Sequence, residues 1–194
     1  MKRALRPLTL YQGVTLIELM VVLAIIAIFL MFALPSYENV QTGDRIASEM
    51  NDLNGDVEFA RISAVSRGIP VTICASTDLK SCSDSASWGT GWIIFSDFNG
   101  DHSLQSTQGD TLLRVHSPLA GGSQADTLTG KAGQPGNFSG NLEWLTINRM
   151  GATTQGVLSL HNAANDPQWR HCLIVPMTGK TYTDTETNNP GVCP

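Results

Sequence analysis

The stretch that decides the fold is residues 13–34, which read GVTLIELMVVLAIIAIFLMFAL. Within it, the 21 residues from Val14 to Leu34 contain only two polar side chains, those of Thr15 and Glu18. A helix rises about 1.5 Å per residue, so a helix of this length extends about 31 Å, close to the thickness of a bilayer's hydrocarbon core. The sequence therefore predicts a membrane-spanning helix over residues 14–34.

Basic residues flank this segment on one side only. Lys2, Arg3 and Arg6 precede it, and no acidic residue occurs before Glu18. Positive charge next to a membrane span is retained in the cytoplasm. The pattern predicts a cytoplasmic N-terminus, a single pass through the inner membrane and a periplasmic remainder of the chain.

Glu18 is the charged residue within the apolar segment. A carboxylate in a membrane helix costs roughly 2.5 to 3.5 kcal/mol at the centre of the bilayer and less towards its edge. The segment itself contains no basic partner. If the chain were cut after Gly13, however, Val14 would carry a free amine one helical turn from Glu18. Glu18 would then neutralise the amine of its own chain or of a neighbouring chain.

Residues 13–19, GVTLIEL, resemble the class III signal of type IV pilins and type II secretion pseudopilins. The resemblance implies that a prepilin peptidase cuts between Gly13 and Val14 and methylates the new amino terminus at Val14. Glu18 takes the place of the family's glutamate five residues into the mature chain, where it serves filament assembly. Pro35 takes the place of the helix-kinking proline. Val14 departs mildly from the Phe or Met that the family usually has.

An ordinary signal anchor or a cleaved secretory signal is the alternative interpretation. A secretory signal has an apolar region of about 7 to 15 residues, followed by a cleavage site of small residues. The apolar run of 21 residues is longer, and no A-x-A-like site follows it. These two features favour the pilin-like signal.

The composition leaves room for one soluble domain after the apolar segment. Without residues 1–13 the chain keeps 9 of its 12 basic residues and all 17 acidic ones, which gives a net charge of -8. An acidic domain is poorly suited to nonspecific binding along nucleic acid, because phosphate neutralisation supplies most of that affinity. We expect a leader over residues 1–13, an N-terminal helix over 14–67 and a β-rich head over 68–194.

The four cysteines all lie in the part of the chain expected in the oxidising periplasm, where disulfides form. Four cysteines allow three pairings. We favour the local one, Cys74–Cys82 and Cys172–Cys193, which closes loops of 9 and 22 residues. From loop-closure entropy, the two disulfides would stabilise the fold by about 2.6 and 3.4 kcal/mol. A zinc site formed by all four thiolates is the rival interpretation, although no CxxC spacing occurs.

Beyond Pro35 the pattern predicts that the helix resumes and continues to Arg67, where Gly68-Ile69-Pro70 stops it. Apolar residues recur there at steps of three and four, which is typical of an amphipathic helix packed on a core: Ile46, Met50, Leu53, Val57, Ala60 and Ala64. The fold class expected is therefore α+β, with a long N-terminal helix packed on an antiparallel β-sheet head.

Short β-rich runs separated by Gly, Ser and Asp predict the strands of the head. They are Val71–Ala75, Trp92–Ser96, Thr111–His116, Leu142–Ile147, Val157–His161, Cys172–Val175 and a short strand at 181–183. Residues 117–140 are low in apolar side chains. The sequence predicts a mobile loop there, with a short strand at most.

The head carries a second resemblance, to the GspH/FimT (FimU-like) minor pilins and pseudopilins. It rests on three blocks of sequence: Arg61-x-x-Ala64-x-x-Arg67-Gly68-x-Pro70-Val71-Thr72-Ile73-Cys74, Gly91-Trp92-Ile93-Ile94-Phe95-x-Asp97-x-Asn99-Gly100, and Asp110-x-Leu112-Leu113-Arg114-Val115. The resemblance implies a low-copy subunit that primes filament assembly at the inner membrane and sits at or near the tip. Its implied partners are the prepilin peptidase, other minor pilins, the major pilin and the inner-membrane assembly platform.

Two machines share this family, the type IV pilus and the type II secretion system. The two-cysteine tail favours the pilus branch. Some family members bind DNA through a Gly-Arg-x-Arg motif between two cysteines near the C-terminus. The matching residues here are Gly179-Lys180-Thr181-Tyr182, with Lys180 as the single phosphate contact and Asp184 and Glu186 adding repulsion. DNA binding is therefore the alternative function rather than the expected one.

The sequence gives even less support for a metal site or a catalytic site. Asp97–Asp101 suggests a calcium loop, but glycine and glutamate do not stand at the EF-hand positions, and Asn99-Gly100 better fits a hairpin turn. The four histidines show no metal-binding spacing, and no GxSxG motif occurs. We expect no catalytic residue, no metal and no cofactor. A structural assembly subunit is favoured over a DNA-uptake receptor and over a periplasmic enzyme on a membrane anchor.

Overall fold

The computed structural model describes residues 13–119 and 126–194, without the side chains of residues 32–36. The chain falls into two compact units, Met1–Gln41 and Thr42–Pro194. One long helix, α1 (Leu16–Arg67), contributes to both units. We call the second unit the head; it contains all nine strands of the described residues.

The helix ends where the sequence predicts. Its last residue is Arg67, and Gly68 follows with a φ of 68°, a left-handed conformation that glycine adopts without strain. All six residues of the predicted apolar stripe are buried, with exposed fractions of 3% or less. The stripe is therefore a core-facing surface, as its spacing indicates.

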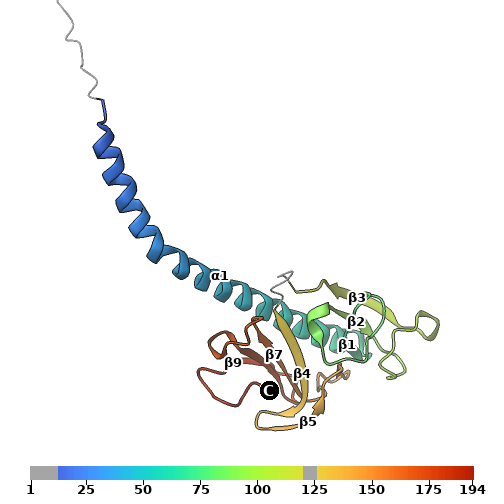
Figure 1. Ribbon diagram of the computed structural model, residues 1–194. Coiled ribbons are helices and arrows are strands. Elements are labelled where there is room, and N and C mark those ends of the chain that lie inside the picture. The colour runs from blue at the N-terminus through green and yellow to red at the C-terminus, as the bar shows by residue number, and fades with distance from the viewer. Residues whose placement is uncertain (1–12, 120–125) are drawn as a thin grey trace, which may run out of the picture. The chain divides into compact units, whose positions relative to one another are not determined.

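The strands form two antiparallel sheets, which confirms the α+β class. The first sheet has the order β3 (Thr111–His116), β2 (Trp92–Ser96), β1 (Val71–Ala75) and β6 (Trp144–Ile147). The second has the order β5 (Asn137–Asn141), β4 (Thr127–Gln134), β7 (Gly156–His161), β8 (His171–Val175) and β9 (Tyr182–Thr185). Within the head, Figure 1 shows the β1–β3 strands in green and the β7 and β9 strands in orange and red, both groups lying against α1.

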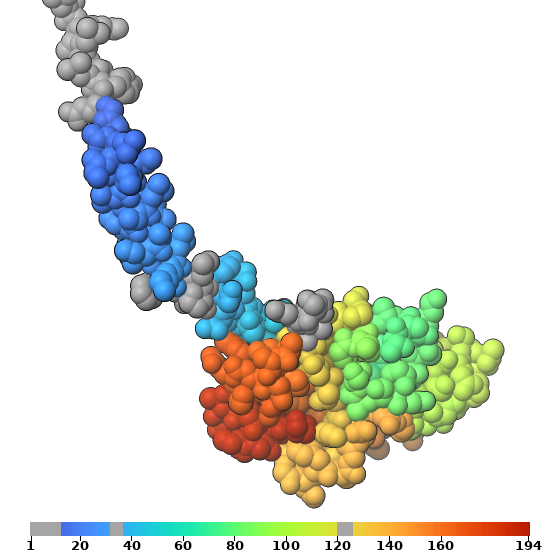
Figure 2. Space-filling model, viewed as in Figure 1, coloured from blue at the N-terminus to red at the C-terminus, as the bar shows by residue number. Residues whose placement is uncertain are grey.

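One core joins α1 to both sheets. The stripe packs with inward-facing side chains of the first sheet, such as Ile73 and Ile94, and with those of the second, such as Leu158 and Leu173. Figure 2 shows the green residues of the first sheet and the red residues of the second as separate surfaces of the head. Each sheet depends on the same helix face for the burial of its apolar side chains.

Polar contacts also join the helix to both sheets. The buried carboxylate of Asp56 accepts a hydrogen bond from Trp92 Nε1 at 2.9 Å and an ion-paired one from Arg114 Nη1 at 2.8 Å. Arg45 donates two hydrogen bonds to Asp126, next to β4, at 2.6 and 2.9 Å. The pKa of Arg45 is raised, chiefly by the hydrogen bonds to Asp126. These pairs fix how α1 is rotated over the sheets, because each one specifies a single side-chain position.

Each sheet has a second, smaller apolar cluster on the face turned away from α1. On the first sheet Cys74, Ile93 and Phe95 form it, together with the partly buried Cys82. On the second sheet Val157, Cys172 and Ile174 pack with Cys193. The disulfides Cys74–Cys82 and Cys172–Cys193 lie in these clusters, with Cα–Cα distances of 5.5 and 5.6 Å. The predicted local pairing is therefore confirmed, and the zinc interpretation of the four cysteines is wrong.

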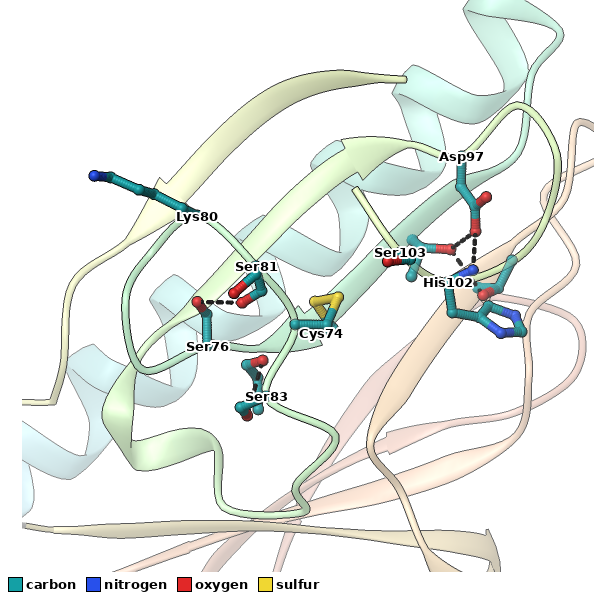
Figure 3. The surroundings of a disulfide bond; sticks show 12 residues. Cys74, Ser76, Lys80, Ser81, Ser83, Asp97, His102 and Ser103 are labelled. Carbon is teal, nitrogen blue, oxygen red and sulfur yellow. Dashed lines mark hydrogen bonds between the residues drawn. A yellow bond between two sulfur atoms is a disulfide. The ribbon is translucent and has the colours of Figure 1, made fainter. Parts of the chain in front are cut away.

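The loop around Cys74–Cys82 is organised by short polar side chains (Figure 3). Ser76 donates its hydroxyl proton to the Ser81 carbonyl at 2.6 Å, and Ser83 N–H donates to the Ala75 carbonyl at 2.9 Å. Asp78 accepts from the backbone N–H groups of Lys80 and Ser81, and these bonds lower the pKa of its carboxyl group. The loop thus holds its own shape over the outer face of the sheet.

The prediction of a mobile loop over residues 117–140 is wrong for its second half. Residues 127–134 form β4, the longest strand of the head, which pairs with both β5 and β7. The strand escapes recognition because its inward positions carry Leu128, Gly130 and Ala132, of which only Leu128 is large. Gly130 lies under Trp88 and Leu142, so their bulk replaces the side chain that the strand lacks. Residues 120–125 of the predicted loop lie outside the described residues.

We predict that Gly130→Ala lowers the free energy of unfolding by about 1 to 3 kcal/mol. A Cβ at this position would lie 2.6 Å from the Leu142 carbonyl oxygen and 2.8 Å from Trp88 Nε1, so the core must shift to hold it. Urea unfolding of the purified protein in detergent measures the effect. Gly55→Ala is the matched control, since nothing lies within 4 Å of its Cβ position on α1; it should stabilise by about 0.5 to 1 kcal/mol. Equal effects of the two changes would contradict this packing.

Removal of the two disulfides should have unequal effects. Cys172 and Cys193 are 21 residues apart, and Cys74 and Cys82 are 8 apart. A longer loop loses more entropy on closure. Replacement of Cys172 and Cys193 by serine should therefore lower the free energy of unfolding by about 3.4 kcal/mol, and replacement of Cys74 and Cys82 by about 2.6 kcal/mol. The same urea titration measures both losses. A larger loss for the shorter loop would show that loop-closure entropy does not set the order.

Candidate functional site

The N-terminal segment that carries the cleavage motif consists of exposed side chains. Every described residue from Gly13 to Met31 is exposed. Its large apolar side chains, from Val14 to Met31, have exposed fractions between 47% and 77%. The described part of the segment therefore exposes apolar side chains around its whole circumference. A contiguous exposed apolar surface of this extent is a binding surface for a membrane or for other chains.

The two polar residues of the segment lie at the start of the helix. Thr15 precedes Leu16, the first residue of α1, and its Oγ1 accepts a hydrogen bond from the Glu18 N–H at 3.3 Å. A threonine followed three residues later by a glutamate is the spacing of a capping box. Glu18 also stands in the first turn, where the helix dipole favours a negative charge. This capping role was not predicted, although the Thr15-x-x-Glu18 spacing is visible in the sequence.

Nothing in the fold requires glycine at the predicted cleavage position. A Cβ atom built on Gly13 meets no atom of the described residues within 4 Å. A requirement for glycine at this position must therefore come from another molecule, as it would if a peptidase bound the residue in a narrow site.

Some predictions about this segment fall outside the described residues. Lys2, Arg3 and Arg6 belong to residues 1–12, which are not among them. Pro35 belongs to residues 32–36, whose side chains are not described, so the expected kink stays a prediction. The sequence also predicts a membrane span over residues 14–34. Within the described part of the chain, no helix is both long and apolar enough to cross a bilayer.

The proposed DNA contact, Lys180, is exposed in the turn between β8 and β9. The preceding Gly179 is buried with a φ of 74° and is packed so closely on the Gly151 carbonyl that no side chain fits. Arg61 of α1 reaches this turn, because its Nε would lie 3.1 Å from a Cβ at Gly179. The fold thus brings a second basic residue to the turn that carries Lys180. The sequence does not predict this, because Arg61 and the turn are distant along the chain.

The calcium interpretation of Asp97–Asp101 fails because hydrogen-bond donors of the protein itself already surround the carboxylate of Asp97. Its buried carboxylate accepts hydrogen bonds from the Thr72 hydroxyl and the Gly100 N–H, both at 2.8 Å. It also accepts one from the His102 N–H at 3.1 Å (Figure 3). Among the described residues, no group of three or more histidines, cysteines and carboxylates is placed to hold a metal. The predicted hairpin turn at Asn99-Gly100 is also wrong, since the β2–β3 connection is a longer loop organised by Asp97 and Asp110.

Comparison with protein families gives two matches. The model of the family described as Type II transport protein GspH matches residues 49–179, and that of the prokaryotic N-terminal methylation motif matches residues 9–34. The first match covers more than half of the chain. The chain belongs to the GspH family. The family is one of minor pilin and pseudopilin components, which are structural proteins rather than enzymes.

Solved structures resemble the chain at low sequence identity. The type IV minor pilin FimU of Pseudomonas aeruginosa is 19% identical, with a TM-score of 0.58 over 78% of this chain and 96% of that one. A second crystal form of FimU gives a TM-score of 0.54 over 76% and 99% of the two chains. The minor pseudopilin EpsH of the Vibrio cholerae Type 2 Secretion System is 12% identical, with a TM-score of 0.49 over 73% and 97%. No curated protein matches the chain significantly.

The two family matches of the GspH-family chain correspond to two parts of its structure, the exposed apolar segment and the head. The methylation motif covers the exposed apolar segment, including Gly13, Val14 and Glu18. The GspH match begins at Glu49 on α1 and ends at Gly179, so it contains eight of the nine strands and stops before β9. Lys180 and Cys193 lie beyond the match.

Proposed function

We propose that this GspH-family protein is a minor pilin or pseudopilin, cut by a prepilin peptidase between Gly13 and Val14 and built into a type IV pilus or a type II secretion pseudopilus. The observation that carries the proposal is the combination of two features in one chain. A segment matching the N-terminal methylation motif exposes its apolar side chains on all sides, and a GspH-family head follows it.

The exposed segment has two apolar environments in this proposal. Before assembly it lies in the inner membrane, with the N-terminus in the cytoplasm and the head in the periplasm. After assembly it packs against the same segments of neighbouring subunits inside the filament. The two disulfides support an oxidising compartment for the head, since disulfides persist in the periplasm and are rare in the cytosol.

Glu18 sets the register between subunits in this proposal. After cleavage, the methylated amine of Val14 carries a positive charge, and a carboxylate is its natural partner in an apolar filament core. The structure supports this use of Glu18, because the side chain is exposed and its backbone N–H is already satisfied by Thr15. The carboxylate is therefore available to a neighbouring chain.

As a minor subunit, the protein primes assembly at the inner membrane and is incorporated at or near the filament tip. Its partners are the other minor pilins, the major pilin and the assembly platform of the inner membrane. Membership of the GspH family supports this part of the proposal, which follows from the family resemblance of the head.

Replacement of Gly13 by leucine should block processing. We expect the wild-type protein from its native membrane to have the mass of residues 14–194 plus one methyl group, less four hydrogens for two disulfides. The Gly13→Leu protein should keep residues 1–13, because the peptidase needs the small residue while the fold does not. Intact-mass spectrometry before and after reduction measures both. A variant cleaved like the wild type would refute the assigned site.

Replacement of Glu18 by alanine should leave cleavage largely intact and reduce incorporation into filaments at least tenfold, because the Val14 amine of a neighbour loses its partner. Glu38→Ala is the matched control, since Glu38 is also exposed on α1 but lies outside the methylation motif. Immunoblots of sheared filaments and of membranes measure incorporation and processing separately. Normal incorporation of the Glu18→Ala protein would contradict the proposed role.

A further inference from the structure

Apolar side chains gather on the exposed surface around the C-terminal end of α1. Two shallow grooves adjoin there. Ile62 and Val65 line the first, on the helix itself, and Ile69, Phe98 and Met150 line the second. Val65 of the first groove lies near the second, since its Cγ2 would lie 3.4 Å from a Cβ at Gly151, the residue after Met150. Together with Met177, from the neighbouring turn, these residues form what we call the end surface; Met150 is 80% exposed and Met177 66%.

The turns that present the two methionines are held rigidly. Asn148 Oδ1 accepts hydrogen bonds from the Met150 N–H at 2.9 Å and the Ala152 N–H at 3.1 Å. Thr153 links the second turn to the first, because its N–H donates to the Met177 carbonyl at 3.1 Å and its hydroxyl to the Pro176 carbonyl at 2.8 Å. Side chains on such preorganised turns lose less backbone entropy on binding than those on a flexible loop.

The end surface is also positively charged. Arg61 and Arg149 line the grooves, and the exposed Arg67 and Lys180 flank them. These are four of the nine basic residues of the chain after Gly13, which carries 17 acidic residues in total. Among the residues lining the two grooves only Glu58 is acidic, and it lies 3.9 Å from Arg61. The end surface is therefore positively charged and apolar, although the protein as a whole is acidic.

Composition indicates which kind of partner fits this surface. Methionine, aromatic residues and arginine are enriched at protein–protein interfaces, whereas lysine and acidic residues are depleted there. A polyanion such as DNA would use the four positive charges but leave the exposed methionines in water. Two copies of the protein meeting through this same face would place like charges together, which costs free energy.

We infer that the end surface docks an acidic, partly apolar face of a neighbouring filament subunit. The inference rests on the proposed function, since it names the surface through which the subunit contacts its neighbour. In the docked state Met150 and Met177 supply buried apolar area, while Arg61 and Arg149 pair with carboxylates of the partner. Electrostatic complementarity then selects the partner and the apolar contacts hold it.

Photo-crosslinking in native cells tests the inference. The full chain carries p-benzoylphenylalanine in place of Met150, or in place of Gln134 as the control, an exposed residue at the end of β4. We expect an adduct at position 150 and not at 134, joined to a subunit peptide that contains acidic residues. Arg149→Glu should reduce the adduct about tenfold or more, and reversal of the charge on the crosslinked acidic residue of the partner should restore it. Lys131→Glu, an equal change of charge on β4, should leave the adduct unchanged.

Several results would overturn the inference: equal adducts at positions 150 and 134, a nuclease-sensitive adduct, an adduct to position 150 of a second copy, or no effect of Arg149→Glu. Sheared filaments from the same cells separate this failure from failure of the proposed function. If the wild-type chain is in filaments and any of these results is obtained, the inference fails and the proposed function stands. If the wild-type chain is absent from filaments, the proposed function itself fails.

Discussion

The head depends on the burial of one helix face against two sheets. The stripe from Ile46 to Ala64 supplies the apolar partner for the inner faces of both sheets, so neither sheet has a separate core on that side. Asp56 adds a geometric constraint, because a buried carboxylate must keep its bonds to Trp92 and Arg114 or remain unsatisfied in an apolar environment. Arg45 makes the equivalent connection to the second sheet through Asp126. The sheets are thus positioned by the helix as well as by each other.

The outer faces of the sheets explain the placement of the disulfides. A head with one shared core has little apolar material left to cover the sheet faces turned away from α1, where only small clusters form. Cys74 on β1 and Cys172 on β8 each point into such a cluster, and each is bonded to a cysteine of the segment that covers it. A covalent bond holds each covering segment in place where apolar contacts alone are few. The local pairing follows from this arrangement, because the covering segments lie close to the strands along the chain.

Sequence periodicity predicted the elements whose apolar residues recur at regular spacing. It did not predict the elements that are packed by residues distant in the sequence. The buried stripe, the end of α1 and the bounds of β1, β2 and β3 agree with the sequence analysis, since each depends on local apolar spacing and on stop signals such as Gly68. β4 was missed because Trp88 and Leu142 fill the space over Gly130, and nothing near Gly130 in the sequence shows this. For the same reason, the approach of Arg61 to the turn that carries Lys180 was not predictable, because the fold alone brings them together.

The exposed apolar residues of α1 are of two kinds, and the difference bears on what covers them. In residues 14–31 they surround the helix on every side, so only an environment that is apolar on all sides can cover them. Ile62 and Val65 are exposed on a helix whose opposite positions, Ala60 and Ala64, are buried in the head, so they need cover from one side only. A bilayer or a bundle of helices meets the first requirement, and the face of a single protein meets the second. The positive charge of the end surface then distinguishes that face from a membrane's apolar interior, because the charge of Arg149 would be desolvated there.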